Sequence, residues 1–157
     1  MRQAMMTRRG VLAGAVTLMA MPGGLRAGDG PAIHVLTDPN CGCCGAWMAI
    51  LQQAGFAVTS KASAGVALYR EKAARGITPE MSSCHTADVE GYVIEGHVPV
   101  ADIRRLLAER PDALGLAVPG MPYGSPGMGP EDAREAYDVM LMLRDGTAEV
   151  FTSYPAA

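Results

Sequence analysis

The segment Asp38-Pro39-Asn40-Cys41-Gly42-Cys43-Cys44-Gly45-Ala46-Trp47 places three thiols within four consecutive positions. An apolar, β-branched run at residues 33–37 precedes it and is typical of a short buried strand. After it, apolar side chains recur at the spacing of one buried helix face: Trp47, Ile50, Leu51 and Ala54. The sequence therefore predicts a strand-to-helix turn with the cysteines at the N-terminus of the helix, where the helix dipole lowers the pKa of thiols.

Downstream of this turn, glycines, prolines and apolar spacing predict further elements. The helix of residues 44–54 is followed by a strand at 56–59 and by a second helix from residue 63 or 64 to Gly76. The apolar face expected for that second helix consists of Val66, Tyr69 and Ala73.

The second half of the chain predicts two hairpins and a third helix. Extended runs at residues 82–89 and 92–96 flank a Glu-Gly turn, and Pro99 is expected to begin a helix that ends at Arg110. Residues 111–136 predict a long irregular segment. Asp145-Gly146 then predicts a C-terminal hairpin that either extends the sheet or covers one of its faces.

The resulting α/β order, β-α-β-α-β-β-α with thiols on the first βα turn, resembles the thioredoxin superfamily over about residues 31–110. This resemblance implies that the loop before the third strand packs against the cysteine turn. Cys84 and His85 occupy that loop, where the superfamily usually has a cis-proline. The missing proline sets the chain apart from ordinary dithiol–disulfide catalysts.

The first 27 residues differ in kind from the rest. Arg8-Arg9 leads into an apolar run at residues 11–21 that is too short to span a bilayer, and Pro22-Gly23-Gly24 ends it. Residues 1–27 resemble a twin-arginine export signal, and an ordinary secretory signal is the alternative. We therefore expect a single mature domain, residues 28–157, in the periplasm and without a membrane span.

The charge of this expected mature domain excludes some partners. The full chain has a net charge of −3, and removal of residues 1–27 takes away four arginines and no acidic residue. Nine basic side chains then oppose sixteen acidic ones, for a net charge of about −7. This balance argues against nucleic acid or an anionic membrane as a partner and mildly favours cations.

The four cysteines, Cys41, Cys43, Cys44 and Cys84, allow several interpretations. Two structural disulfides fit poorly, because both would have to end within one four-residue turn. Thiolates are soft ligands for Cu(I), zinc or iron–sulfur clusters. Three crowded sulfurs favour a Cu(I) cluster with bridging thiolates over an all-cysteine zinc site, which usually uses two spaced pairs.

Histidines and methionines extend the list of candidate ligands. His85 adjoins Cys84 and is either a ligand or a hydrogen-bonding neighbour. Met121 and Met128 lie in a proline- and glycine-rich loop, where they either bind the metal as thioethers or attach the loop to the core. His97 is expected to lie at the start of the third helix, with metal binding as the alternative, and His34 to be structural.

Longer motifs resemble those of the CopG-like copper-resistance proteins, a family long described as a domain of unknown function. The shared motifs are Cys-Gly-Cys-Cys-Gly at 41–45, Ser-Cys-His-Thr at 83–86, Gly-Tyr-Val-Ile-Glu-Gly-His-Val-Pro at 91–99, and the block from Gly115 to Met128. The resemblance spans residues 31–154.

This resemblance implies an exported, thioredoxin-like protein that holds a Cu(I) cluster and acts in copper resistance or copper redox chemistry. It implies that Cys41, Cys43, Cys44 and Cys84 are the metal ligands and leaves His85, Met121 and Met128 as further candidates. Copper ions and an unidentified redox or copper-transfer protein are the expected partners. A thiol–disulfide oxidoreductase that uses Cys41 and Cys44, or a structural zinc protein, remains an alternative.

Overall fold

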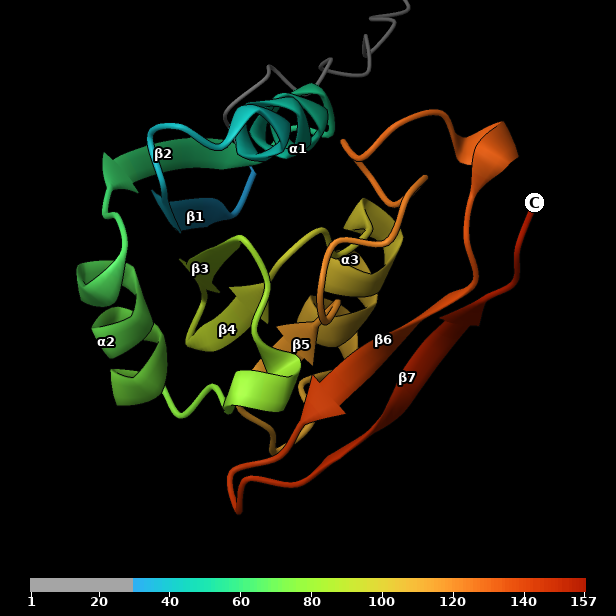
Figure 1. The fold of residues 1–157 in the computed structure, drawn as a ribbon. Coiled ribbons are helices and arrows are strands. Elements are labelled where there is room, and N and C mark those ends of the chain that lie inside the picture. The colour runs from blue at the N-terminus through green and yellow to red at the C-terminus, as the bar shows by residue number, and fades with distance from the viewer. Residues whose placement is uncertain (1–29) are drawn as a thin grey trace, which may run out of the picture.

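A computed structural model describes residues 30–157, so the export signal expected over residues 1–27 lies outside the described residues. Apart from one additional strand, the strands and helices follow the predicted order (Figure 1). The elements are β1 (Ala32–Thr37), α1 (Gly42–Gln53), β2 (Ala57–Ala62), α2 (Val66–Ala74), β3 (His85–Val89), β4 (Tyr92–Glu95), α3 (Val100–Glu109), β5 (Gly115–Ala117), β6 (Tyr137–Met142) and β7 (Ala148–Tyr154), with short 3-10 turns at Pro79–Met81 and Glu131–Ala133. Across residues 30–157, no helix has both the length and the apolar character needed to cross a membrane.

The strands form one mixed sheet in the order β2-β1-β3-β4-β5-β6-β7. β1 and β2 are parallel and connected through α1, while β3 pairs antiparallel with β1 and with β4. The first four strands and three helices therefore have the thioredoxin-like arrangement that the sequence predicts. Glu90 and Gly91 form the predicted β3–β4 turn, both with positive φ, 45° and 88°.

One strand was not expected. β5 lies within the segment predicted to be irregular, and it pairs parallel with β4 and antiparallel with β6. Its sequence, Gly-Leu-Ala, is too short to show strand alternation, so the prediction for this part of residues 111–136 is wrong. Because β5 bridges β4 and β6, the β6–β7 hairpin extends the sheet at the edge opposite β2 (Figure 1).

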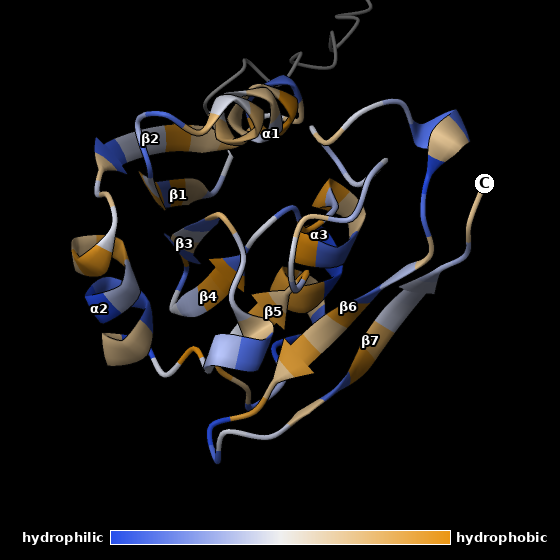
Figure 2. Ribbon diagram, viewed as in Figure 1, coloured by the Kyte–Doolittle hydropathy of each residue, from blue (hydrophilic) through white to orange (hydrophobic). Residues whose placement is uncertain are grey.

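The main core lies between one face of the sheet and helices α1 and α3. Trp47 and Leu51 of α1 and Ile103 and Leu106 of α3 are completely buried in it. Because neighbouring strand residues point to opposite faces, a second, smaller cluster forms on the other face: Ile77, Val93, Ala117 and Met142. Apolar residues accordingly concentrate on β4 and β5, while the β6–β7 turn is hydrophilic (Figure 2).

The predicted apolar face of α2 is wrong. Val66 and Tyr69 are 67% and 68% exposed, whereas the buried residues of the helix are Leu68 and Lys72. A lysine can be buried here because its ammonium group meets Glu95 of β4 at 2.5 Å. The helix therefore presents a charge, as well as a leucine, to the interior.

Candidate metal centre

The cysteine turn connects β1 to α1, as the sequence predicts. Cys41 is the N-cap residue of α1, its backbone N–H donates to the carbonyl of Asp38, and Cys43 and Cys44 lie in the first turn. Cys41 and Cys44 form a disulfide, whereas Cys43 and Cys84 are free. The structure is thus the oxidised form of the Cys-x-x-Cys pair.

Sheet pairing brings Cys84 to this turn. Cys84 immediately precedes β3, whose first residue, His85, is paired with Thr37 at the end of β1. The Sγ of Cys84 lies 3.7 Å from that of Cys44, and the Sγ atoms of Cys41 and Cys43 are 3.3 Å apart. All four sulfur atoms lie within 4.8 Å of one another, so the structure brings the four predicted thiols together.

Two histidines complete the site on the Cys84 side. The Sγ of Cys84 lies 3.2 Å from Nδ1 of His85 and 3.1 Å from Nε2 of His97, and these three residues form a second candidate metal-ligand group. The expectation for His97 was a place at the start of α3, and it does come shortly before Pro99, the N-cap of that helix. Its imidazole is nonetheless fully buried at the site, with Nδ1 2.8 Å from the carbonyl oxygen of Pro126.

Burial favours neutral imidazoles at both positions. Desolvation, with smaller effects from His97 and Lys72, lowers the pKa of His85 to about 3. Desolvation also lowers the pKa of His97, although its hydrogen bond to Pro126 opposes this. Neutral imidazole is the form that binds metal ions. Nε2 of His85 has no hydrogen-bond partner among the described residues. The centroid of the His85 ring lies 4.3 Å from the centroid of the Trp47 ring.

Cys84 is held as a thiol when no metal is present. Burial, with a contribution from nearby Cys43, raises the pKa of Cys84 to about 12. A bound soft cation would lower the pKa of Cys84, because its attraction for the thiolate offsets the desolvation of that charge.

The loop that carries the two methionines is ordered by its own backbone. Met128 N–H donates to Ser125 O at 2.8 Å, and Gly124 N–H donates to Met128 O at 3.1 Å. A Cβ on Gly127, where φ is +86°, would collide with the backbone of Trp47, so the loop packs closely against α1. The loop therefore has means of order other than its methionine side chains. Met121 is 55% exposed and Met128 is half-buried.

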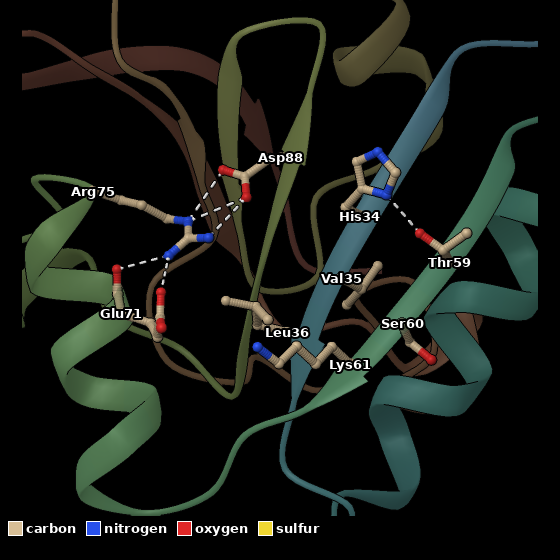
Figure 3. A pocket seen from close by; sticks show the side chains of 9 residues that line it. All are labelled: His34, Val35, Leu36, Thr59, Ser60, Lys61, Glu71, Arg75 and Asp88. Carbon is tan, nitrogen blue, oxygen red and sulfur yellow. Dashed lines mark hydrogen bonds and ion pairs between the residues drawn. The ribbon is translucent and has the colours of Figure 1, made fainter.

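A polar hollow elsewhere uses none of these residues. Its lining includes His34 on β1, Thr59 on β2 and Asp88 on β3 (Figure 3). Arg75, the C-cap residue of α2, forms ion pairs with Asp88 and Glu71, and Nδ1 of His34 lies 2.6 Å from the hydroxyl of Thr59. These groups already have partners, which agrees with the structural role expected for His34.

The fold and the site together define a class: thioredoxin-like proteins that carry a sulfur-rich candidate metal centre at the N-terminus of α1. Two solved structures, described as forms 1 and 2 of the copper resistance protein CopG, are each 46% identical to this chain. The matches cover 80% of this chain and 98% of theirs, with TM-scores of 0.75 and 0.74. The chain belongs to the CopG family of copper resistance proteins.

A family model also matches part of the chain. Residues 81–128 match a family described as "Protein of unknown function, DUF411". This segment contains Cys84, His85, His97 and the methionine loop. No curated protein matches the chain.

Proposed function

We propose that this protein handles copper in the periplasm by binding Cu(I) through Cys41, Cys43, Cys44 and Cys84. The observation that carries the proposal is the mutual approach of four sulfur atoms to within 4.8 Å across 40 residues of sequence. Thiolates are the preferred ligands of Cu(I), and sulfurs this close can bridge more than one ion. The CopG relatives, named copper resistance proteins, support the choice of metal.

Nitrogen and thioether ligands extend the proposed set. His85 and His97 place neutral ring nitrogens beside Cys84, where each either binds copper or hydrogen-bonds to the coordinating sulfur. Met121 and Met128 remain candidate thioether ligands. Met121, which is exposed, is the better placed of the two to meet incoming copper.

The Cys41–Cys44 disulfide supports redox control of copper binding. Two-electron reduction by a dithiol donor converts this disulfide into two thiols and leaves the donor as a disulfide. Loss of the thiol protons then supplies four thiolates to Cu(I). Transfer of two electrons from the Cys41 and Cys44 thiolates to a disulfide acceptor, which leaves as a dithiol, re-forms the Cys41–Cys44 bond. Its re-formation removes two of the four ligands, which favours copper release and makes Cys41 and Cys44 the redox-active pair.

Anaerobic titration tests the proposal. The reduced protein is expected to bind at least one equivalent of Cu(I) in competition with a chromogenic chelator, and Cys84→Ser is expected to weaken binding. The oxidised protein is expected to bind less copper than the reduced protein. Binding of less than one equivalent by the reduced protein, or unchanged binding by Cys84→Ser, would overturn the proposal.

The second candidate function is thiol–disulfide exchange, which the Cys41–Cys44 disulfide itself favours. Insulin reduction by the metal-free protein, with Cys43→Ser as the comparison, separates the two functions. Rapid turnover that survives Cys43→Ser would favour simple exchange, because exchange needs only Cys41 and Cys44.

Export is part of the same proposal. Replacement of Arg8 and Arg9 by lysines is expected to retain the protein in the cytoplasm if the twin-arginine route is used. Normal secretion of that variant would indicate the ordinary secretory route instead.

A further inference from the structure

The residue before Cys84 is held by a buried ion pair. Glu95 accepts a hydrogen bond from the backbone N–H of Ser83 at 2.6 Å, and the ammonium group of Lys72 donates to the Ser83 carbonyl at 2.6 Å. Lys72 and Glu95 also contact each other at 2.5 Å through the same carboxylate oxygen that Ser83 uses. The backbone N–H and C=O of Ser83 are therefore both bound by one ion pair.

This ion pair is too deeply buried to be explained as an ordinary surface contact. Lys72 is 3% exposed and Glu95 is completely buried. Burial of two charges carries a large desolvation penalty, and an apolar pair of similar size is often at least as stable. Both members of the pair make hydrogen bonds to Ser83, the residue before Cys84. This location indicates that the pair acts on the position of Ser83.

Contacts on the other side of Ser83 restrict the same residue. Its hydroxyl donates to the carbonyl of Gly120, and Gly120 N–H donates to the carbonyl of Ser82. A Cβ on Gly96, the residue after β4, would overlap the Ser83 side chain, so Gly96 packs closely against Ser83 on one side and Gly120 of the methionine loop contacts it as well. Lateral movement of Ser83 would break at least one of these contacts.

We propose that Lys72 and Glu95 are positioning residues that fix Ser83 and thereby hold the Cys84 sulfur at the metal centre. The hydrogen bonds of both residues go to Ser82, Ser83 and each other, and none goes to the four sulfur atoms. They act through the peptide groups of Ser83, which set the direction from which Cys84 approaches Cys44. The inference rests on the proposed Cu(I) site, and it adds α2 and β4 to the elements that determine its geometry.

The deciding variants separate positioning from simple stability. Lys72→Met or Glu95→Leu alone leaves a buried charge without a partner, so either single variant risks a failure to fold. The double variant Lys72→Met/Glu95→Leu removes both charges and both hydrogen bonds to Ser83. Glu95→Gln removes the negative charge but keeps an oxygen that can accept from both Ser83 and Lys72. Arg75→Met, at the C-cap of α2, is the matched control, because it breaks ion pairs with Asp88 and Glu71 away from the site.

Cu(I) competition and thermal unfolding are measured on each reduced protein. The double variant is expected to keep a Tm close to that of the wild type but to bind Cu(I) about tenfold or more weakly, as changes in the surroundings of metal ligands commonly do. Glu95→Gln and Arg75→Met are expected to bind within about threefold of the wild type. Unchanged affinity in the double variant would overturn the inference, as would a loss of affinity in folded Glu95→Gln, with a Tm close to that of the wild type, as large as that in the double variant.

A metal-free measurement distinguishes this inference from the proposed function. In a Cys41→Ser/Cys43→Ser background, Cys44 and Cys84 are the remaining thiols, and diamide oxidises them to a disulfide by taking two electrons and two protons. The 3.7 Å separation predicts rapid cross-linking, which Lys72→Met/Glu95→Leu should slow at least severalfold. If the wild type binds no copper but cross-linking still depends on the ion pair, the proposed copper-binding function is wrong and the positioning role stands. Equal cross-linking rates with and without Lys72→Met/Glu95→Leu would overturn the positioning role.

Discussion

The Nε2 atom of His97 lies 3.1 Å from the Sγ of Cys84, although thirteen positions separate the two residues. The β3–β4 hairpin accounts for this approach, because it folds the segment after β4 back beside the segment before β3. His97 then receives its second contact from Pro126 in the methionine loop. It is therefore one of the residues that join the cysteine site to that loop.

Replacement of His97 by alanine is expected to weaken Cu(I) binding about tenfold, as loss of a ligand or of its hydrogen-bonding neighbour usually does. Chelator competition on the reduced protein measures the change. His34→Ala is the control, because His34 is exposed and its hydrogen bond goes to Thr59 and not to a cysteine. Equal affinities for His97→Ala and the wild type would show that His97 makes no contribution to the metal centre.

The metal-free protein is expected to lose stability in acid because of His85. Its pKa is about 3 in the folded protein, against 6.5 for an imidazole that is fully exposed to water. Between these values the unfolded chain binds a proton that the folded protein does not, so the free energy of unfolding decreases as the pH falls through this window. Urea unfolding at pH 7 and at pH 4.5 measures this loss. Between the two pH values, the free energy of unfolding should fall by about 2 kcal/mol more in the wild type than in His85→Gln. A parallel loss in both proteins would contradict this assignment.

Gly96→Ala should destabilise the fold by about 2 kcal/mol or more, because glycine is required at this position for two reasons. Its φ is +73°, and an added Cβ would overlap Ser83 and the carbonyl oxygen of Val118. Gly45→Ala is the control: Gly45 lies in α1 with open space around it, so alanine there should stabilise the helix by roughly 0.5–1 kcal/mol. Urea unfolding compares the two variants, and a Gly96→Ala protein as stable as the wild type would contradict the close packing around Ser83.

Asp102 anchors the C-terminal hairpin to α3. Its two carboxylate oxygens accept hydrogen bonds from the hydroxyls of Thr152 and Tyr154, at 2.6 and 2.7 Å. Asp102→Ala should therefore cost about 1–3 kcal/mol of stability and increase hydrogen exchange in β7. The exposed Asp138 on the neighbouring strand provides the control, since Asp138→Ala should change stability by less than about 0.5 kcal/mol. Unaltered exchange in β7 of Asp102→Ala would show that the hairpin is held by its backbone pairing alone.

Local patterns were enough to predict most elements of the fold. The apolar spacing after Trp47, the Glu-Gly and Asp-Gly turns, and Pro111 after α3 each act over a few residues, so the sequence shows them directly. β5 escaped prediction because a three-residue strand takes its stability from its two neighbours, β4 and β6, and has no pattern of its own. The exposed face of α2 escaped for a related reason, since only the position of Glu95 makes the burial of Lys72 favourable.

The sequence by itself determined the thioredoxin-like order of elements and the crowding of three thiols on one turn, because both follow from the identity of neighbouring residues. The tertiary structure alone decided that His97 reaches Cys84 and that a buried ion pair holds Ser83. A charged residue in the apolar strand Tyr-Val-Ile-Glu was the available signal for the ion pair, but it did not identify its partner. Side chains distant in sequence meet only when strands have paired and buried the core, and spacing along the chain does not encode that distance.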